Sequence, residues 1–401
     1  MHCVRKVTDE LWWVGANDRR TPLFENIHPI PNGVSYNSYL LLDEKTVLFD
    51  CVDWSAAPQL VENVEHLLEG RELDYIVLHH LEPDHGAGLW AVLQRWPGAT
   101  IVASLAAQRF MDQFGFAPIQ GQRITAKEGE GLSFGKHSLT FYAAPMVHWP
   151  DVMVSYLEPG GILFSADAFG TFGALNGKLF NDELDFPGKW LDEARRYYTN
   201  IVGKYGPQVQ ALLAKAAGLD IRILCPLHGP VWRSDIGWFV DKYDKWSRYE
   251  PEDRAVLLVY GSMYGGTEQA AEALACALTE RGVEVSMYDV STTHVSQLIA
   301  ESFRCSHIVL ASVTYNMDFY PPVRDYLEDM KALGLRDRTF ALMENGTWNP
   351  AAGKLMSAFV TEELAGCAVL EPRVTMKSTL KGDQAGELEA LAEAVAASVK
   401  G

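Results

Sequence analysis

The sequence predicts an α/β protein of two domains, at residues 1–250 and 254–401. Two observations lead to this prediction. Short alternating strands such as "YNSYLLLD" and "VMVSYLEP", separated by Gly, Pro and Asn, dominate the first half, which has only a few helices. From residue 254 onward strands and helices alternate regularly, which is the pattern of a doubly wound parallel sheet. The boundary is expected near "SRYEPEDRA", a polar stretch that contains Pro251.

The composition limits the class of protein. With 401 residues, 48% of them hydrophobic, the chain can form the cores of two or three domains. Its six cysteines never form a CxxC pair, so we expect neither a disulfide framework nor a cysteine-ligated metal. A formal net charge of −18 argues against a nucleic-acid partner, because such binding needs a basic surface. The start "MHCVRKVTDELWW" lacks a signal-peptide core and no apolar run could span a bilayer, so we expect a cytoplasmic protein without a membrane partner.

The strongest signal in the first half is "HHLEPDHGAG", from His79 to Gly88, directly after the apolar strand "YIVL". Charged groups beside a buried strand are costly to desolvate unless something neutralises them, and a metal ion would do so. Three more apolar strands end in "MVHWPD", "ILFSADAFG" and "ILCPLHGP". Together these strand ends supply seven candidate metal ligands, namely His80, Glu82, Asp84, His85, His148, Asp167 and His228.

Seven ligands are too many for one metal, but two metals that share a bridging carboxylate fit the number. Histidine and carboxylate are ligands for first-row transition metals, and loops at strand ends can converge on one edge of a sandwich. Positions 80, 82 and 84 alternate regularly from the strand. His79 is therefore expected to face the other way, and to pack in the core or support the ligands.

The second half contains three loops that are suited to a flavin. The first, "YGSMYGGTEQAA", opens a helix with hydroxyl groups and glycines, which offer hydrogen-bond donors to a phosphate. It lacks the lysine of a nucleoside-triphosphate loop, so a monophosphate fits better. Two further loops, "TYNMDFYPP" and "ENGTWNPAAG", follow later strands, at the edge where ligands of this fold bind. The three loops predict an FMN site, with turn formation and simple burial as the alternative. The candidate residues are Ser262, Met263, Tyr264, Gly265, Gly266, Thr267, Thr314, Tyr315, Asn316, Glu344, Asn345, Gly346, Thr347 and Trp348.

These motifs resemble the flavodiiron proteins, also called A-type flavoproteins, over essentially the whole chain. In that family a metallo-β-lactamase-like αββα sandwich is fused to a flavodoxin-like domain. Its iron-ligand motif, HxExDH followed by a single His, Asp and His, is matched here at every position. The "SMYGGT" and "TYN" loops also match, whereas "ENGTW" replaces a third loop that is rich in Gly and Ser in many relatives. The resemblance implies one iron on His80, Glu82 and His148, a second on Asp84, His85 and His228, and Asp167 as the bridge.

The resemblance implies an oxidoreductase that reduces O2 to water, NO to N2O, or both, with electrons supplied through FMN. Two alternatives remain at this stage. One is a zinc-dependent hydrolase on the metallo-β-lactamase scaffold, although zinc is redox-inert and gains nothing from a flavin domain. The other is a flavin electron-transfer protein with an inactive metal pocket, against which the complete ligand set argues.

Candidate proton donors and partners complete the expectations. Tyr197 and Tyr198, in "RRYYTN", could donate protons near the irons, the alternative being that their helix simply packs onto the core. Trp149, beside His148, could wall off the site. The resemblance also implies rubredoxin or a reduced deazaflavin coenzyme as electron donor. It implies a head-to-tail homodimer, or a dimer of such dimers, in which the FMN of one chain faces the diiron pair of the other.

Overall fold

The computed structural model describes residues 2–115 and 122–401. Contacts divide the chain into two compact units, which are described separately below. The first unit comprises Met1–Tyr198 and Pro207–Asp244, and the second comprises Thr199–Gly206 and Lys245–Gly401. The domain limits at residues 250 and 254 remain a prediction from the sequence. Among the residues that the structure describes, no helix has both the length and the apolar character to cross a membrane.

The first unit is built on two sheets. A seven-stranded sheet has the order β1-β2-β7-β8-β9-β10-β11 and a five-stranded sheet has the order β12-β13-β14-β15-β16. The first contains β1 (Arg5–Lys6), β2 (Leu11–Trp13), β7 (Tyr39–Leu42), β8 (Thr46–Phe49), β9 (Tyr75–Leu78), β10 (Thr100–Ala103) and β11 (Arg123–Thr125). The second contains β12 (Gly131–Ser133), β13 (Ser138–Ala143), β14 (Met153–Glu158), β15 (Ile162–Phe164) and β16 (Ile223–Cys225). Two small ribbons pair β3 (Ala16–Asp18) with β6 (Val34–Tyr36) and β4 (Leu23–Phe24) with β5 (His28–Pro29).

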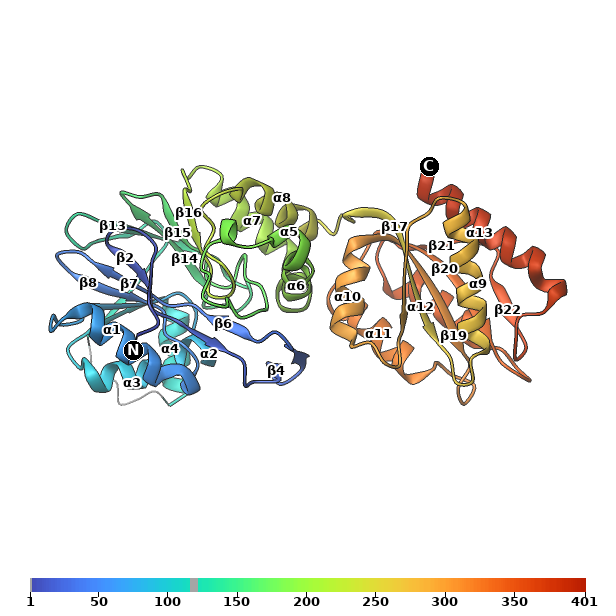
Figure 1. Cartoon of the computed structure of the whole chain (residues 1–401), viewed down its shortest axis with the longest axis horizontal. Coiled ribbons are helices and arrows are strands. Elements are labelled where there is room, and N and C mark those ends of the chain that lie inside the picture. The colour runs from blue at the N-terminus through green and yellow to red at the C-terminus, as the bar shows by residue number, and fades with distance from the viewer. Residues whose placement is uncertain (1, 116–121) are drawn as a thin grey trace. The chain divides into compact units, whose positions relative to one another are not determined.

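The two sheets pack face to face through one apolar core. Phe49 and Val77 from the first sheet join Phe141 and Phe164 from the second in a single buried cluster. Figure 1 shows α1 and α3 beside the first sheet, and α7 and α8 on the side of β14, β15 and β16. Layers of helix, sheet, sheet and helix therefore give the predicted αββα sandwich of the metallo-β-lactamase type. The α-helices of this half are α1 (Ala57–Leu68), α2 (Pro83–Gly86), α3 (Leu89–Arg95), α4 (Leu105–Gln113), α5 (Phe186–Lys189), α6 (Leu191–Tyr197), α7 (Gly206–Ala216) and α8 (Ile236–Ser247).

The chain between α6 and α7 stays helical but changes its pitch. A π-helical segment, Tyr198–Val202, and a 3₁₀ turn, Gly203–Tyr205, join the two α-helices. Two further 3₁₀ turns, Trp54–Ala56 and Asn181–Glu183, lie in loops of the first unit.

The second unit is a doubly wound parallel sheet, as the sequence predicts. Its strand order is β18-β17-β19-β20-β21, with β22 also pairing with β20, and every neighbouring pair is parallel. The strands are β17 (Asp253–Gly261), β18 (Val285–Asp289), β19 (Cys305–Val313), β20 (Thr339–Asn345), β21 (Ala368–Val369) and β22 (Val374–Met376). The order reverses at β17, which is where ligands bind in such sheets.

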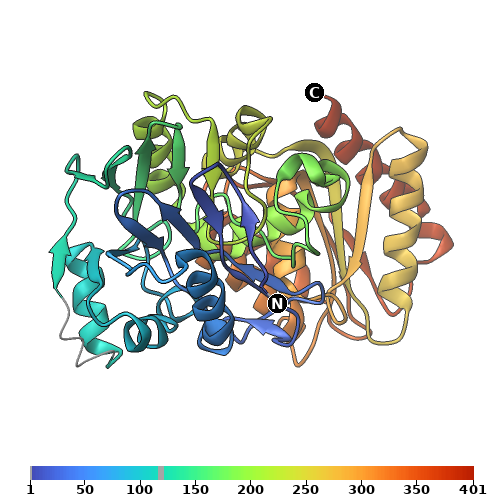
Figure 2. The ribbon, with the colours of Figure 1, turned by 60° about the vertical axis from the view of Figure 1, so that its left-hand side comes forward.

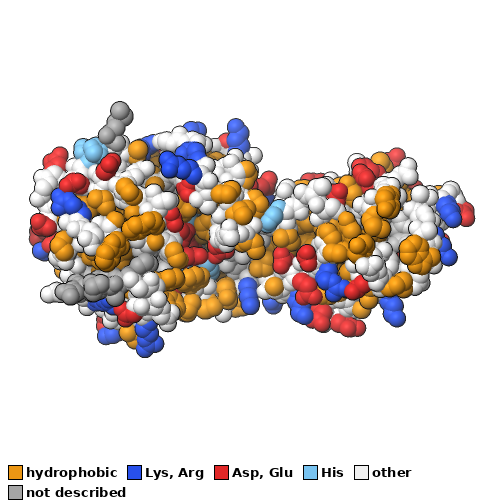
Figure 3. All heavy atoms as spheres, turned by 90° about the horizontal axis from the view of Figure 1, so that it is seen from below, with side chains coloured by type: hydrophobic (Ala, Val, Ile, Leu, Met, Phe, Trp, Pro, Cys, Tyr) orange, Lys and Arg blue, Asp and Glu red, His pale blue; other side chains and the backbone are white. Residues whose placement is uncertain are grey.

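Helices cover both faces of this sheet. The helices are α9 (Gly266–Glu280), α10 (Val295–Arg304), α11 (Pro321–Ala332), α12 (Ala352–Glu363) and α13 (Ala385–Lys400), with a 3₁₀ turn at Gly382–Gln384. One core cluster contains Leu274 of α9 and Leu391 of α13, and these two helices lie side by side in Figure 2. A second cluster, on the other face, contains Leu298 of α10, Leu327 of α11 and Met356 of α12. Acidic, basic and apolar side chains are interspersed over the surface seen in Figure 3.

One buried hydrogen-bonded chain joins the two sheets of the first unit. His79, at the end of β9, has its Nδ1 2.6 Å from Asp50 Oδ2 and its Nε2 2.6 Å from Ser155 Oγ on β14. The backbone carbonyl of His79 also accepts the N–H of Met153 at 3.0 Å. All three side chains of this chain are at most 1% exposed. His79 therefore acts as a polar link between the sheets directly before the first candidate ligand, His80.

We predict that Ser155→Ala destabilises the first unit by about 1–3 kcal/mol, because it leaves a buried imidazole nitrogen without its partner. The metal-free protein should unfold at a lower urea concentration, with an unchanged denaturant slope. Ser138→Ala, on the exposed end of β13, is the matched control and should leave the midpoint unchanged. Equal midpoints for Ser155→Ala and the wild type would contradict the role given to this link.

Candidate metal centre and flavin pocket

The candidate ligands lie on four loops that follow strands of both sheets. His80 follows β9, and Glu82 precedes α2, a single turn that carries Asp84 and His85. Pro83 occupies the first position of that turn, where its fixed φ angle favours helix and no N–H is needed. The other three come from the loops after β13, β15 and β16, and are His148, Asp167 and His228.

One group of ligand atoms gathers around the Glu82 carboxylate. Glu82 Oε2 lies 3.2 Å from His80 Nε2 and 3.0 Å from His148 Nε2. Asp167 Oδ2 lies 3.4 Å from His80 Nε2 and 3.3 Å from His148 Nε2. Two atoms that each bind one cation at about 2.1 Å are about 3.0–3.4 Å apart for right-angled to tetrahedral geometry. The four side chains could therefore hold one metal ion.

A second group repeats this arrangement around Asp84. Asp84 Oδ2 lies 3.4 Å from His85 Nε2 and 3.3 Å from His228 Nε2. The other oxygen of Asp167, Oδ1, lies 3.2 Å from His85 Nε2 and 3.5 Å from His228 Nε2. The two Asp167 oxygens thus face different groups, as a carboxylate that bridges two cations would.

The hydrogen bonding of these atoms fits a pair of cations. Both oxygens of Asp84, both of Asp167, and Nε2 of His85 and His228 are buried and have no hydrogen-bond partner among the described residues. Buried polar atoms are almost always satisfied, so orphaned atoms that point at a common centre indicate a missing partner. With neutral imidazoles the three carboxylates would leave three negative charges in a buried site, which two divalent cations would more than offset.

The ionisable groups also perturb one another. Burial by itself would lower the pKa of His85, but Asp84 and Asp167 raise it to about 9. The pKa of His148 is likewise about 9, with Asp167 and Glu82 overcoming the effect of burial. Burial would raise the pKa of Asp167, yet the surrounding imidazoles hold it well below its usual value. Asp167 therefore stays ionised and attracts positive charge into the site.

Two of the imidazoles are oriented by contacts that the sequence does not predict. His228 Nδ1 donates to the backbone carbonyl of Ser35 at 2.7 Å, which directs Nε2 toward the centre. His80 Nδ1 lies 3.3 Å from Asp151 Oδ1, and the other oxygen of Asp151 accepts the N–H of Leu81 at 2.8 Å. Metal-bound histidines usually have such a partner on the second ring nitrogen. Asp151 lies in the same "MVHWPD" motif as the candidate ligand His148. This closeness in sequence is the feature that could have identified Asp151.

Glu25 is a further acidic group at the site, and no motif in the sequence pointed to it. It lies in the turn between β4 and β5, with a left-handed backbone (φ 50°). Burial, and then the charge of the nearby Glu82, raise its pKa to about 7. In the same ribbon, the Phe24 ring lies 5.3 Å from His228, edge to face. This short ribbon therefore places an acid and an aromatic ring against the metal centre.

The two candidate proton donors, Tyr197 and Tyr198, have different surroundings. The Tyr197 ring lies 5.4 Å from His228, and its buried hydroxyl has no hydrogen-bond partner among the described residues. Burial, followed by the charge of Asp167, raises the pKa of Tyr197 well above its usual value. Tyr198 instead packs edge to face on Tyr243, with ring centroids 4.9 Å apart. Trp149 lies 5.1 Å from the His80 ring and 6.3 Å from the His148 ring, so it forms one wall of the site.

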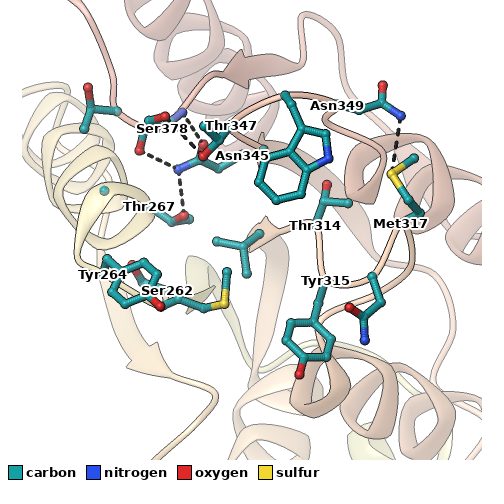
Figure 4. A pocket seen from close by; sticks show the side chains of 17 residues that line it. Ser262, Tyr264, Thr267, Thr314, Tyr315, Met317, Asn345, Thr347, Asn349 and Ser378 are labelled. Carbon is teal, nitrogen blue, oxygen red and sulfur yellow. Dashed lines mark hydrogen bonds between the residues drawn. The ribbon is translucent and has the colours of Figure 1, made fainter.

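A pocket of about 450 Å³ lies at the carboxyl end of the parallel sheet in the second unit, and Figure 4 shows it. Residues of all three predicted loops line it, and its described lining contains no charged side chain. Tyr264 and Trp348 are 96% and 85% exposed, which is unusual for large aromatic side chains. The predicted residues that line the pocket are Ser262, Met263, Tyr264, Gly266, Thr267, Thr314, Tyr315, Asn316, Asn345, Gly346, Thr347 and Trp348.

Two residues predicted to contact the flavin do not line the pocket, and they stabilise its loops instead. The Glu344 carboxylate accepts from Gly353 N at 2.7 Å and from Thr375 Oγ1 at 2.9 Å, and it pairs with Arg373. Gly265 has a left-handed backbone (φ 86°) at the start of α9, and its N–H donates to Ser262 Oγ. Ser378 and Thr379, in the loop after β22, also line the pocket and were not predicted.

Comparison with known proteins agrees with this architecture. Residues 34–229 match the ODP family beta lactamase and residues 258–398 match the flavodoxin family. The chain is 30% identical over 403 residues to a nitric oxide reductase of Moorella thermoacetica, with 98% of each chain covered. Its fold superposes on rubredoxin oxygen:oxidoreductase from Desulfovibrio gigas with a TM-score of 0.91 and 29% identity, covering 99% and 98% of the chains. The flavodiiron protein from Giardia intestinalis gives a TM-score of 0.90 at 25% identity, covering 99% and 96%.

We predict that Asp151→Asn weakens metal binding by about 10- to 100-fold, the usual cost of losing a carboxylate that orients a ligand histidine. Competition with a chelator would measure this affinity. Asp112→Asn, a surface carboxylate on α4 paired with Arg123, is the matched control. Equal affinities for both variants and the wild type would show that Asp151 does not orient His80.

Proposed function

Because the chain belongs to the flavodiiron proteins, we propose that it is an oxidoreductase that reduces O2 to water, NO to N2O, or both. The reaction takes place at a non-heme diiron centre that receives its electrons through FMN. The observation that carries this proposal is the position of Asp167, whose two oxygens face two separate groups of imidazole and carboxylate ligands. The relatives named nitric oxide reductase and rubredoxin oxygen:oxidoreductase support both substrates.

We propose the following ligand assignment. His80, Glu82 and His148 hold one iron, and Asp84, His85 and His228 hold the other, with Asp167 as the bridge. The two groups of distances around Glu82 and Asp84 support this division. A donor set of imidazole nitrogens and carboxylate oxygens, without sulfur, suits iron in oxygen chemistry.

Several features favour redox chemistry over hydrolysis. Glu82 provides a hard oxygen ligand, where zinc hydrolases of this scaffold generally have histidine. Zinc has no redox chemistry, so a flavin domain in the same chain would serve no purpose for a zinc hydrolase. The paired ligand groups are complete, which argues against an inactive metal pocket in an electron-transfer protein.

Iron held by these ligands would supply a redox-active site for the gas, and FMN in the pocket of the second unit would supply electrons singly or in pairs. Reduction of O2 to two waters consumes four electrons and four protons, whereas two NO yield N2O and water with two of each. The chain must therefore deliver protons to a buried site. We propose that the Tyr197 hydroxyl donates one of them, since it is buried beside His228 without another partner among the described residues. Tyr198, which packs on Tyr243, stays a prediction from the sequence as a second donor.

We propose that rubredoxin or a reduced deazaflavin coenzyme supplies the electrons, rubredoxin being named for one structural relative. We also propose a head-to-tail homodimer, alone or as a dimer of dimers, in which each FMN serves the irons of the partner subunit. The exposed aromatic rim of the flavin pocket, Tyr264 and Trp348, supports an arrangement in which another protein surface covers it.

The test of the function is anaerobic turnover of iron- and FMN-loaded protein with O2 and with NO in parallel. We predict that His148→Asn loses or weakens one iron and abolishes turnover of both gases, while its FMN content stays normal. Elemental analysis and flavin absorbance measure the two cofactors. Stoichiometric zinc with hydrolase activity and no flavin, after iron-replete expression, would refute the proposed function.

The dimer makes a separate prediction. A metal-deficient variant, His148→Asn, and a flavin-deficient variant with a disrupted loop at residues 262–267 should each be inactive alone. A purified mixed dimer should recover activity, because the FMN of one chain serves the irons of the other. If electrons pass within one chain, neither subunit has both cofactors, so a mixed dimer that contains both cofactors but shows no turnover would rule out the cross-subunit route.

A further inference from the structure

Three loops of the flavin pocket meet at one amide side chain. Asn345 is the last residue of β20 and is only 5% exposed. Its amide faces Thr267, near the start of α9, and Ser378, in the loop after β22, as Figure 4 shows. All three residues line the pocket. Asn345 is therefore placed to set the relative positions of the loops that surround the flavin.

Asn345 pairs with both backbone groups of Ser378. The Ser378 N–H donates to Asn345 Oδ1 at 2.9 Å, and Asn345 Nδ2 donates to the Ser378 carbonyl at 2.9 Å. Ser378 has a φ of 74°, a left-handed conformation that a residue other than glycine keeps only when its surroundings hold it. The Ser378 carbonyl in turn packs on Gly266, where an added Cβ would lie 2.2 Å away. The amide thus holds the loop after β22 against the start of α9.

This pairing fixes the orientation of the amide. If oxygen and nitrogen were exchanged, two donors would face each other at the Ser378 N–H, and two acceptors at its carbonyl. The remaining Nδ2 hydrogen is therefore directed at Thr267 Oγ1, 3.2 Å away. Since Thr267 accepts this bond, its own hydroxyl hydrogen must be donated elsewhere. Among the described residues it has no acceptor, although Thr267 is fully buried and lines the pocket.

We propose that Asn345 is a positioning residue for the flavin phosphate: it holds the Thr267 hydroxyl so that its hydrogen points into the pocket and donates to a phosphate oxygen. This inference rests on the proposed binding of FMN. Thr267 is the second residue of α9, where unpaired backbone N–H groups and the helix dipole also favour an anion. A neutral amide acting through a neutral hydroxyl adds one donor without adding a charged group to the pocket.

The test compares FMN with riboflavin, which lacks the phosphate, in titrations of flavin-free protein followed by flavin fluorescence. The wild type should prefer FMN. In Asn345→Ala the affinity for FMN should fall by about 10- to 100-fold, the usual effect of one hydrogen bond to a charged group. Riboflavin affinity should change little, which also shows that the pocket is still folded. Asn345→Asp keeps the acceptor for Ser378 N–H but cannot make either donation, so it should lose the FMN preference as well.

A double-substitution cycle distinguishes positioning from general support of the fold. Thr267→Val should reduce the FMN preference, and adding Asn345→Ala to it should reduce that preference no further. Asn349→Ala is the matched control, because Asn349 lines the same pocket but donates to Met317 Sδ. It should affect both flavins equally. Additive losses in the double variant, or an unchanged FMN preference in Asn345→Ala, would overturn the inference. A wild type that binds neither flavin would instead refute the proposed function.

Discussion

The metal-centre half of the structure depends on one electrostatic constraint: three carboxylates and four imidazoles share a largely buried site. Asp84 and Asp167 have no hydrogen-bond partner there among the described residues. Such a site is stable only if positive charge enters it, since buried charges are strongly unfavourable without compensation. The arrangement of strand ends, the position of Asp167 between two groups, and the partners of Nδ1 in His80 and His228 all serve the same two cation positions.

The same constraint ties the metal centre to the packing of the sandwich. Glu82 comes from a loop of the first sheet, whereas His148 and Asp167 come from loops of the second, yet their atoms lie 3.0–3.4 Å from His80 or from one another. Ligands from two sheets can keep such distances only if the sheets do not slide. The buried Asp50–His79–Ser155 chain crosses between the sheets one residue before His80. Stability of the fold and geometry of the metal centre are therefore properties of the same contacts.

The sequence predicted those parts of the protein that depend on local order along the chain. The doubly wound sheet follows from alternating strands and helices, and the candidate ligands could be selected because each follows an apolar strand. Glu25 could not be selected, because its position depends on a short ribbon folding over loops that lie far along the chain. Glu344 was expected at the flavin, but its partner Thr375 belongs to β22, whose pairing with β20 is set by tertiary structure, and Arg373 directly precedes that strand. Ser378 was missed for the same reason.

The flavin pocket is built on a different principle from the metal centre. Its described lining holds hydroxyl, amide, thioether and aromatic groups but no charged side chain. An anionic phosphate can be bound in such a pocket only by many neutral donors held in fixed directions, which makes the residues that orient those donors as important as the donors themselves. In the metal centre, by contrast, the ligands include charged carboxylates, and their positions suit only a cation. A chain that buries its metal ligands but leaves Trp348 and Tyr264 largely exposed beside the flavin presents the flavin, rather than the irons, to an approaching protein surface.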